Sequence, residues 1–317
     1  MKSYVVTVTL NPAIDKTVII DKLQIGGLNR VQSVRMDPGG KGINVARVLH
    51  QFEIPVYAAG VIAGIQGQNL LQYLNKEGIK TDFLTVPGET RTNLKVVEAS
   101  SNITTEINEP GFSVESSDME AFIQRLYGLL QDASYLVLGG SLPKQVDASI
   151  YQELMKISGK LGVRVILDAD GEALLQGIQA VPYAIKPNLH ELERLAGRKL
   201  TSDREILQEA RKLLEQGIAI IIVSMGAQGA IVMDKKEAYR VRTAPIVPKS
   251  TVGAGDSMVA VLVYCLINRY SLAQTAEWIT AAGTVTASKP GTQVCSLPEV
   301  RQFLSYVQAE QVNGDLH

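Results

Sequence analysis

The chain reads Ser250-Thr251-Val252-Gly253-Ala254-Gly255-Asp256-Ser257 near its C-terminal end, and an apolar run typical of a helix follows over 258–267. A glycine-rich turn that enters a helix points unpaired backbone N–H groups at one place, where the helix dipole adds positive potential. Such a place attracts phosphate. Asp256 beside it makes sense as a base that takes a proton from a hydroxyl attacking that phosphate. We therefore predict a phosphoryl-transfer centre formed by Asp256 with Gly253, Ala254 and Gly255.

The same segment has a plainer interpretation. Aspartate is a preferred helix N-cap residue, and glycines often serve a tight turn alone. On this segment by itself, capping explains Asp256 as well as catalysis does, so the prediction needs support from elsewhere in the chain.

The composition excludes several classes of protein. The chain has 317 residues, of which 46% are hydrophobic, so it can bury a sizeable core. With 31 basic and 32 acidic residues its net charge is −1, which argues against nucleic-acid partners and a polybasic membrane surface. Two cysteines and three histidines are too scattered for a zinc site, and the longest apolar runs are too short to span a bilayer. We expect a cytoplasmic protein without membrane contact.

Short β-branched runs alternate with longer helix-like segments along most of the chain. This alternation predicts right-handed crossovers and an α/β fold with a doubly wound, mostly parallel sheet. The strand-like runs cover 4–10, 56–63, 135–138, 163–167, 184–186 and 219–224; the helix-like segments cover 42–50, 68–77, 119–130, 150–161, 190–196 and 203–216.

Two regions break this rhythm, because each holds a pair of strand-like runs with no helix between them. The runs cover 17–21 with 30–36, and 92–98 with 104–108. We expect them to leave the main sheet as a small β-sheet lid, inserted at about 16–36 and 90–109 into a single domain spanning 1–317. A lid over a substrate, also usable as a dimer contact, is the favoured interpretation because polar candidates cluster there. Surface hairpins without function are the alternative.

A second glycine-rich stretch, Asp37-Pro38-Gly39-Gly40-Lys41-Gly42-Ile43-Asn44, precedes an early helix. Its glycines allow the backbone to approach a ligand closely, Lys41 supplies a mobile cation, and Asn44 lies on the first turn of the helix. These features suit a phosphorylated, polyhydroxylated ligand. Most lone glycine-rich loops are only turns, but the coincidence with the Asp256 segment strengthens the prediction.

Other polar candidates follow or lie on predicted strands. Asp15 comes just beyond the first strand, where ligands bind in open α/β sheets, although it is also a plausible turn residue. Arg91, Asn93 and Lys95 alternate along one strand and share a face, which favours an anion clamp or, equally, a solvated sheet face. Ser141 follows a buried strand and offers a hydroxyl to the same ligand.

Two further turns predict contacts of another kind. Asn188 and Glu191 have capping-box spacing, and the same pair would reach Mg²⁺, usually through water. Ser224, Gly226 and Gly229 follow a buried strand in a turn that would admit ribose and phosphates, or that serves only as a hairpin turn.

Taken together, these motifs resemble those of the ribokinase-like (PfkB) sugar kinases over nearly the whole chain. The matching motifs, in the family's order, are T-L-N-P-A-I-D, G-G-K-G-I-N-V-A-R, T-R-T-N-L-K, G-G-S-L-P, K-P-N-x-x-E, V-S-M-G-A-Q-G-A and T-V-G-A-G-D-S-M. The resemblance implies an α/β/α sandwich with a β lid, phosphoryl transfer from ATP with Mg²⁺, and a homodimer formed through the lids.

The resemblance also implies a role for each matching residue. Asp256 corresponds to the catalytic base, the Gly253 to Asp256 amides to the anion hole, and Glu191 to a metal-bound water position. Sugar-phosphate contacts are implied for Asp15, Gly39, Gly40, Lys41, Asn44, Arg91, Asn93, Lys95 and Ser141. Nucleotide contacts are implied for Lys186, Asn188, Ser224, Gly226, Gly229, Thr251 and Gly253.

Within the family the chain is most similar to the hexose-phosphate kinases. Lys41 favours the branches that act on fructose 1-phosphate or tagatose 6-phosphate, and the T-R-T-N-L-K run favours fructose 1-phosphate. Tagatose 6-phosphate and fructose 6-phosphate are the alternative acceptors. A sensor of nucleotides or sugar phosphates without turnover is an alternative of another class, whereas a dehydrogenase lacks support because no dinucleotide fingerprint follows an early strand.

Overall fold

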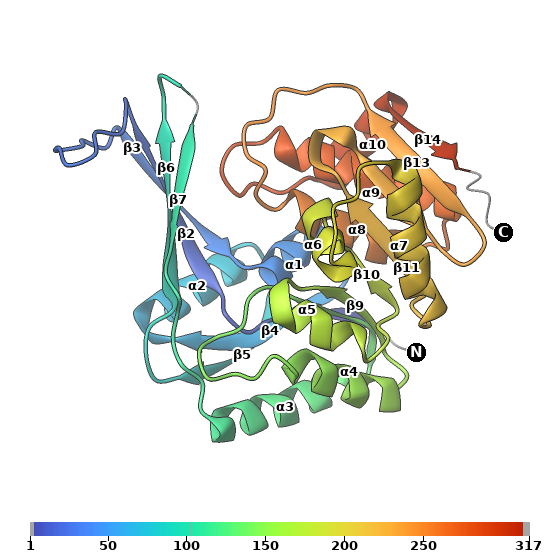
Figure 1. Ribbon diagram of the computed structural model, residues 1–317. Coiled ribbons are helices and arrows are strands. Elements are labelled where there is room, and N and C mark those ends of the chain that lie inside the picture. Colours follow the sequence, from blue (N-terminus) through green and yellow to red (C-terminus); the bar gives the residue numbers. More distant parts are fainter. Residues whose placement is uncertain (1–2, 102, 313–317) are drawn as a thin grey trace.

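The large sheet crosses the molecule from edge to edge (Figure 1). The computed structural model describes residues 3–101 and 103–312, so the ends of the predicted 1–317 domain and residue 102 of its second insertion lie outside it. Within the described residues ten strands form this sheet. In spatial order they are β14 (Val307–Gln311), β13 (Ala238–Thr243), β12 (Ala230–Met233), β11 (Ile220–Ser224), β10 (Ala184–Ile185), β9 (Arg164–Asp168), β8 (Ala133–Gly139), β1 (Tyr4–Thr9), β4 (Val56–Ala63) and β5 (Lys80–Val86).

Strand direction divides the sheet into two parts. From β11 to β5 each strand pairs in parallel with its neighbour. At the other edge, β12, β13 and β14 pair antiparallel. The predicted mostly parallel, doubly wound α/β fold is therefore confirmed, with an antiparallel edge that the sequence analysis did not anticipate.

Helices cover both faces of this sheet, because parallel strands need crossovers and successive side chains of a strand point to opposite faces. Val6 and Val8 of β1 belong to one apolar cluster and Val5 to the other. The first cluster includes α3 (Ser116–Leu130), α4 (Ile150–Lys160), α5 (Gly171–Ile178), α6 (Leu189–Ala196) and α7 (Asp203–Glu215). The second includes α1 (Lys41–Gln51), α2 (Gly64–Lys76), α8 (Ala254–Ile267), α9 (Leu272–Ala287) and α10 (Leu297–Phe303).

A separate small sheet projects away from the large one, on the left in Figure 1. Its strands, in spatial order, are β3 (Ser33–Gly39), β2 (Ala13–Ile20), β6 (Arg91–Glu98) and β7 (Thr104–Asn108). Cross-strand register places Asp15 between Asp37 and Asn93. Val18, Ile20 and Val96 form a small apolar cluster of their own on this sheet. The expected second sheet is thus confirmed, and its two faces differ in chemistry.

Two short 3₁₀ turns complete the described elements, η1 (Gly226–Gln228) after β11 and η2 (Leu304–Tyr306) before β14. Among the helices of the described residues, none combines the length and the apolar character that crossing a membrane requires.

Candidate active site

The first turn of α8 carries Asp256. Gly253 is the N-cap residue, in a left-handed conformation with φ 79° that favours glycine, and it gives the helix no side-chain cap. The amides of Gly255 and Asp256 in the first turn of α8 therefore keep their donors for a ligand, whereas the Ala254 amide donates to the carbonyl oxygen of Thr251. Asp256 is buried, and its Oδ2 accepts a hydrogen bond of 2.8 Å from Nδ2 of Asn44 on α1. The interpretation of Asp256 as the N-cap is wrong, because its carboxylate faces a neighbouring helix.

Two lysines predicted for opposite halves of the site meet on one carboxylate. Nζ of Lys41 lies 3.0 Å from Oδ1 of Asp168, and Nζ of Lys186 lies 3.4 Å from the same oxygen. A Cβ placed on Gly255 would lie 3.0 Å from Nζ of Lys186, so this ammonium group also lies beside the first turn of α8. No role for Asp168 was predicted from the sequence, although its position at the carboxyl end of a buried strand is a signal that would have found it.

These charges change one another's protonation. Burial, together with the negative charge of Asp168, raises the pKa of Asp256 to about 6. Burial raises the pKa of Asp168, but the positive charges of Lys186 and Lys41 lower it by more. The pKa of Asp168 is therefore below its ordinary value, and its carboxylate stays ionised. Burial opposes the charge of Lys41, but Asp168 and Asp256 outweigh it and raise the pKa of that ammonium group. At neutral pH Asp168 and Asp256 are therefore ionised carboxylates and Lys41 is an ammonium group.

The loop before α1 packs tightly against its surroundings. Gly40 has φ 124°, and a Cβ there would lie 2.6 Å from Cγ2 of Thr9 at the end of β1. A Cβ on Gly39 would lie 2.7 Å from the carboxylate carbon of Asp15. Close packing thus explains both predicted glycines without a ligand. Its consequence for the site is that Lys41 is held at the start of α1 beside the ends of β1 and β8.

The small sheet contributes a buried ion pair. Nζ of Lys95 lies 3.0 Å from Oδ2 of Asp15, and Nδ2 of Asn93 donates to Oδ1 of the same carboxylate at 3.1 Å. Oδ1 of Asn93 is buried without a hydrogen-bond partner in the described structure. Lys95 is thus already neutralised by Asp15, so it is less suited to binding phosphate than the pattern on the strand indicated.

Arg91 lies at the base of the small sheet, where it faces the large one. Its guanidinium donates to the carbonyl oxygen of Asn11 at 3.1 Å, to Oγ of Ser141 at 3.1 Å, and to the carbonyl oxygen of Glu109 at 3.2 Å. None of these acceptors carries a formal charge, so the guanidinium keeps its full positive charge for an anion. The structure therefore brings the predicted pair Arg91 and Ser141 together and adds Asn11.

The predicted nucleotide side continues from Lys186 along the chain. Asn188 and Glu191 form a capping box at the start of α6: Oδ1 of Asn188 accepts from the Glu191 amide at 2.9 Å, and Oε2 of Glu191 accepts from the Asn188 amide at 2.8 Å. Asn188 bridges to Ser224 of β11. The structure thus joins Lys186, Asn188, Glu191 and Ser224 at the carboxyl ends of β10 and β11.

The remaining predicted residues divide between packing and exposure. Gly229 approaches β13 so closely that a Cβ would lie 2.0 Å from the carbonyl oxygen of Val241, which explains this glycine structurally. A Cβ on Gly226 would meet nothing within 4 Å. Thr251 is exposed in the turn before α8, and its carbonyl oxygen accepts from the Ala254 amide at 3.4 Å. Gly226 and Thr251 are therefore open to a ligand.

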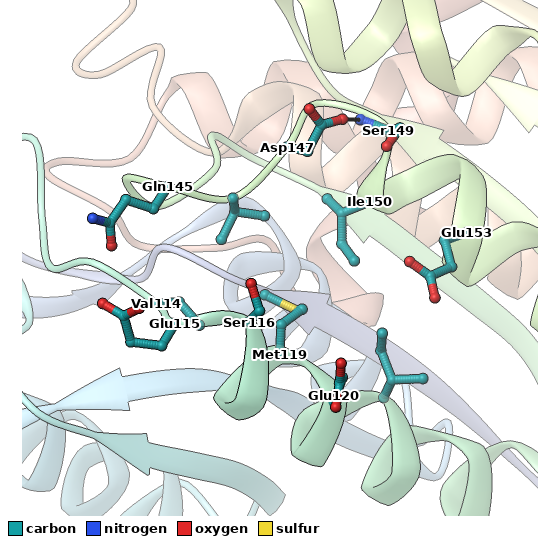
Figure 2. Close-up of a pocket in the computed structure, with 12 residues that line it drawn as sticks. Val114, Glu115, Ser116, Met119, Glu120, Gln145, Asp147, Ser149, Ile150 and Glu153 are labelled. Carbon is teal, nitrogen blue, oxygen red and sulfur yellow. Dashed lines mark hydrogen bonds between the residues drawn. The ribbon is translucent and has the colours of Figure 1, made fainter.

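A cavity of about 280 Å³ lies elsewhere, between the starts of α3 and α4 (Figure 2). None of the predicted site residues lines it. Its rim carries the carboxylates of Glu115, Glu120, Asp147 and Glu153 around apolar side chains that include Met119. Four carboxylates repel a phosphorylated ligand, so this cavity is not the expected active site.

Comparison with known proteins gives consistent matches over the chain. The model of the pfkB family of carbohydrate kinases matches residues 8–300. The 1-phosphofructokinase of Xanthomonas campestris pv. campestris is 39% identical over 273 residues, which are 84% of this chain and 86% of that protein. The 1-phosphofructokinase of Escherichia coli K12 is 33% identical over 313 residues, 99% of this chain and 100% of that protein.

Solved structures agree with these matches. The phosphofructokinase-2 of Escherichia coli in complex with potassium superimposes with a TM-score of 0.89 at 29% identity, covering 96% of this chain and 98% of that one. The tetrameric inhibited form of the same enzyme gives a TM-score of 0.88 at 28% identity, with the same coverage.

Proposed function

The chain belongs to the pfkB family of carbohydrate kinases, and we propose that it transfers the γ-phosphoryl group of ATP to fructose 1-phosphate, giving fructose 1,6-bisphosphate and ADP. One observation carries the chemical part of this proposal. A buried carboxylate, Asp256, lies in the first turn of an uncapped helix, within the field of Lys41 and Lys186. The acceptor follows from the relatives at 33–39% identity that are named 1-phosphofructokinases.

Asp256 serves as the general base. With a pKa of about 6 its carboxylate is ionised at neutral pH, yet it binds a proton more tightly than an ordinary aspartate does. It accepts the proton of the terminal sugar hydroxyl as the oxygen attacks the γ-phosphorus and the bond to the leaving ADP oxygen breaks. The bond from Asn44 holds the carboxylate in one orientation.

Charge on the transferred phosphoryl group is stabilised from two directions. The Gly253 to Gly255 turn offers backbone amides and the positive end of the helix dipole. Lys41 and Lys186 bring mobile cations from the sugar side and the nucleotide side, respectively. In a site shielded from water these interactions are stronger than they are in solution.

Arg91 and Ser141 hold the phosphate already present on the sugar. The fork of the guanidinium matches the oxygens of a phosphate, and Ser141 adds a hydroxyl beside it. The neutral group of Asp15, Asn93 and Lys95 suits sugar hydroxyls, since it combines acceptors and donors without net charge. Binding energy from this remote phosphate orients the reacting hydroxyl.

ATP occupies the side formed by Lys186, Asn188, Ser224, Gly226 and Thr251, and the donors present fit Mg²⁺ bound mainly to its phosphates. That ion takes one or two carboxylates and completes its shell with phosphates and water. Glu191 offers one carboxylate, and among the described residues no group of three or more acidic, histidine or cysteine side chains is placed to hold a metal ion. Bound there, Mg²⁺ would supply positive charge that stabilises the phosphates of ATP during transfer.

The small sheet acts as a lid, and two copies of the chain pair through its apolar face. Val34 is 55% exposed and pairs in register with Val18 of the apolar cluster. Ile107 is 57% exposed and pairs with Leu94, which packs against the same cluster. A second copy would cover these side chains. Sedimentation velocity tests this assembly: the wild type should sediment as a dimer and Ile107→Glu as a monomer, and an unchanged dimer in the variant would argue against the lid contact.

An acceptor panel tests the reaction. ADP formation is followed by a coupled assay with fructose 1-phosphate, tagatose 6-phosphate and fructose 6-phosphate, each with ATP and Mg²⁺. The highest kcat/KM is expected for fructose 1-phosphate. A higher value for another acceptor would reassign the substrate within the family, and no ADP from any acceptor would favour a sensor.

A further inference from the structure

Asp168 links the two lysines of the candidate site. Its Oδ1 holds both ammonium groups, Lys41 at 3.0 Å and Lys186 at 3.4 Å, although one lysine begins α1 and the other follows β10. The Asp168 side chain is only 2% exposed. Because its Oδ1 is occupied by both ammonium groups, Asp168 acts on the substrates through its two lysines.

The backbone around Asp168 is held on both sides. Its carbonyl oxygen accepts from the Gly140 amide at 3.2 Å, next to Ser141 of the sugar side. The carbonyl oxygen of Leu167 accepts from the Lys186 amide at 3.4 Å, on the nucleotide side. Asp168 is thus anchored in the middle of the sheet, whereas the lysine side chains that contact it are long and flexible. A fixed carboxylate is the element that can set where such ammonium groups lie.

We propose that Asp168 is a positioning residue that holds Lys41 and Lys186 on either side of the transferred phosphoryl group and balances their charge beside Asp256. The proposal rests on the phosphotransfer function given above. Without Asp168, two like charges would share a buried space with Asp256 as their main remaining counter-ion, and Glu191 would act more weakly on Lys41. Lys41 would then turn toward the base instead of toward phosphate.

The charges around Asp256 give this role a measurable signature. Asp256 faces Lys41 and Asn44 of α1, Asp168 of β9 and Lys186 after β10. Asp168 raises the pKa of Asp256, while both lysines lower it. Replacing Asp168 by asparagine removes the negative charge and leaves both positive ones, so the base should lose its proton at a lower pH. A residue needed only for folding would not move this titration.

The test is the pH dependence of kcat/KM for the sugar phosphate at saturating ATP and Mg²⁺. In the wild type, kcat/KM should fall on the acid side near pH 6, because protonated Asp256 cannot accept a proton. In Asp168→Asn this acid limb should shift toward the ordinary aspartate range of about 4. At neutral pH the variant should lose about 10²-fold in kcat/KM, because the lysines are misplaced. Ionisation of the substrates is common to all variants, so only differences between variants count.

Two companion variants sharpen the result. Asp168→Asn combined with Lys41→Met removes one charge of each sign, so its acid limb should return toward the wild-type position. Asp168→Glu keeps the charge but moves the carboxylate by one methylene group, so the limb should stay near pH 6 while kcat/KM falls. Asp82→Asn is the matched control, because it removes a carboxylate paired with Arg125 on another part of the surface, and both the limb and the rate should remain unchanged.

Each outcome bears on the proposal. An unmoved acid limb in Asp168→Asn, or wild-type kcat/KM in Asp168→Glu, would overturn it, and the Glu variant supplies this test even if the Asn variant fails to fold. Failure of the proposed reaction is distinguishable, since the wild type would then give no ADP with fructose 1-phosphate. The same pH profiles would in that case be recorded with whichever acceptor of the panel reacts.

Discussion

Two buried carboxylates of this protein hold lysines in different ways. Asp15, on the small sheet, has one lysine and one amide, each on its own oxygen, so the group is neutral and its partners are fixed. Asp168, at the end of β9, shares a single oxygen between two lysines, and that group carries a net positive charge beside Asp256. The neutral group suits hydroxyls, which need oriented hydrogen bonds. The charged group suits a phosphoryl group in transfer, which needs positive charge that can move with it.

Removing the general base, Asp256, should have the largest effect on turnover, because no other residue of the charged group around Asp168 can accept the proton in its place. We expect Asp256→Asn to lower kcat by roughly 10²–10⁴-fold with little change in KM. Steady-state kinetics measure this, with the melting temperature as the folding control. Near-normal turnover in a folded variant would show that Asp256 is not the base. The functional difference between the charged group around Asp168 and the neutral group around Asp15 would then lose its main support.

Replacing Lys41, which pairs with Asp168, should mainly lower activity, whereas replacing Lys95, which pairs with Asp15, should mainly lower stability. Lys41→Met should lower kcat by about 10²–10³-fold, since it deletes one stabilising charge, with a modest stability loss because Asp168 keeps Lys186. Lys95→Met leaves Asp15 buried without its counter-ion, which should cost about 3–5 kcal/mol of stability. Kinetics and urea unfolding of both variants separate the effects. Equal losses in the free energy of unfolding would mean that the two ion pairs contribute equally to stability.

A third variant tests whether Arg91 acts in substrate binding or in the phosphoryl transfer. Arg91→Lys keeps the charge but loses the fork that reaches Asn11 and Ser141 together. KM for fructose 1-phosphate should rise about 10–100-fold, the equivalent of a charge-assisted hydrogen bond, while kcat changes less. KM for ATP is the internal control and should stay constant. A fall in kcat alone would indicate that Arg91 acts in the phosphoryl transfer, as the charged group around Asp168 does, and not in binding the sugar phosphate.

The smallest expected effect concerns stability. The pKa of Asp256 in the folded state is raised to about 6, above its ordinary value, so the folded protein binds this proton more tightly than the unfolded chain does. The resulting stabilisation is complete below about pH 4 and is lost as the pH rises through 6. Asp256→Asn should therefore be more stable than the wild type at pH 8, by on the order of 1–3 kcal/mol, and this advantage should shrink toward pH 4. Thermal unfolding at both pH values measures the difference, and an equal gap at both would contradict the raised pKa.

Elements with a strong local pattern were predicted closely from the sequence. The strand predicted at 56–63 and that predicted at 104–108 match β4 and β7 in the structure. The capping box at Asn188 and Glu191 also forms as its spacing indicated. In each case the signal lies within a few neighbouring residues, which is the range over which periodicity and capping act.

Elements without such a signal were missed. The antiparallel edge of β12 to β14 and the helices α9 and α10 were not predicted. α9 is apolar on nearly all sides because it is buried, so it lacks the one-sided pattern of a surface helix. Edge strands are defined by pairing with distant segments, and β14 pairs with β13 across more than sixty residues of chain.

The strand–helix alternation that defines the fold class, the glycine turn before α8 and the residue types that can perform phosphotransfer follow from the sequence alone, because they depend on neighbours in the chain. The tertiary structure decided which charges meet. Lys41 and Asp168 are 127 positions apart, and Lys95 and Asp15 are 80 positions apart. Electrostatic energies depend on distance in space and on burial. That is why Asp168 emerged as a central residue of the site only when the sheet had placed it between two lysines.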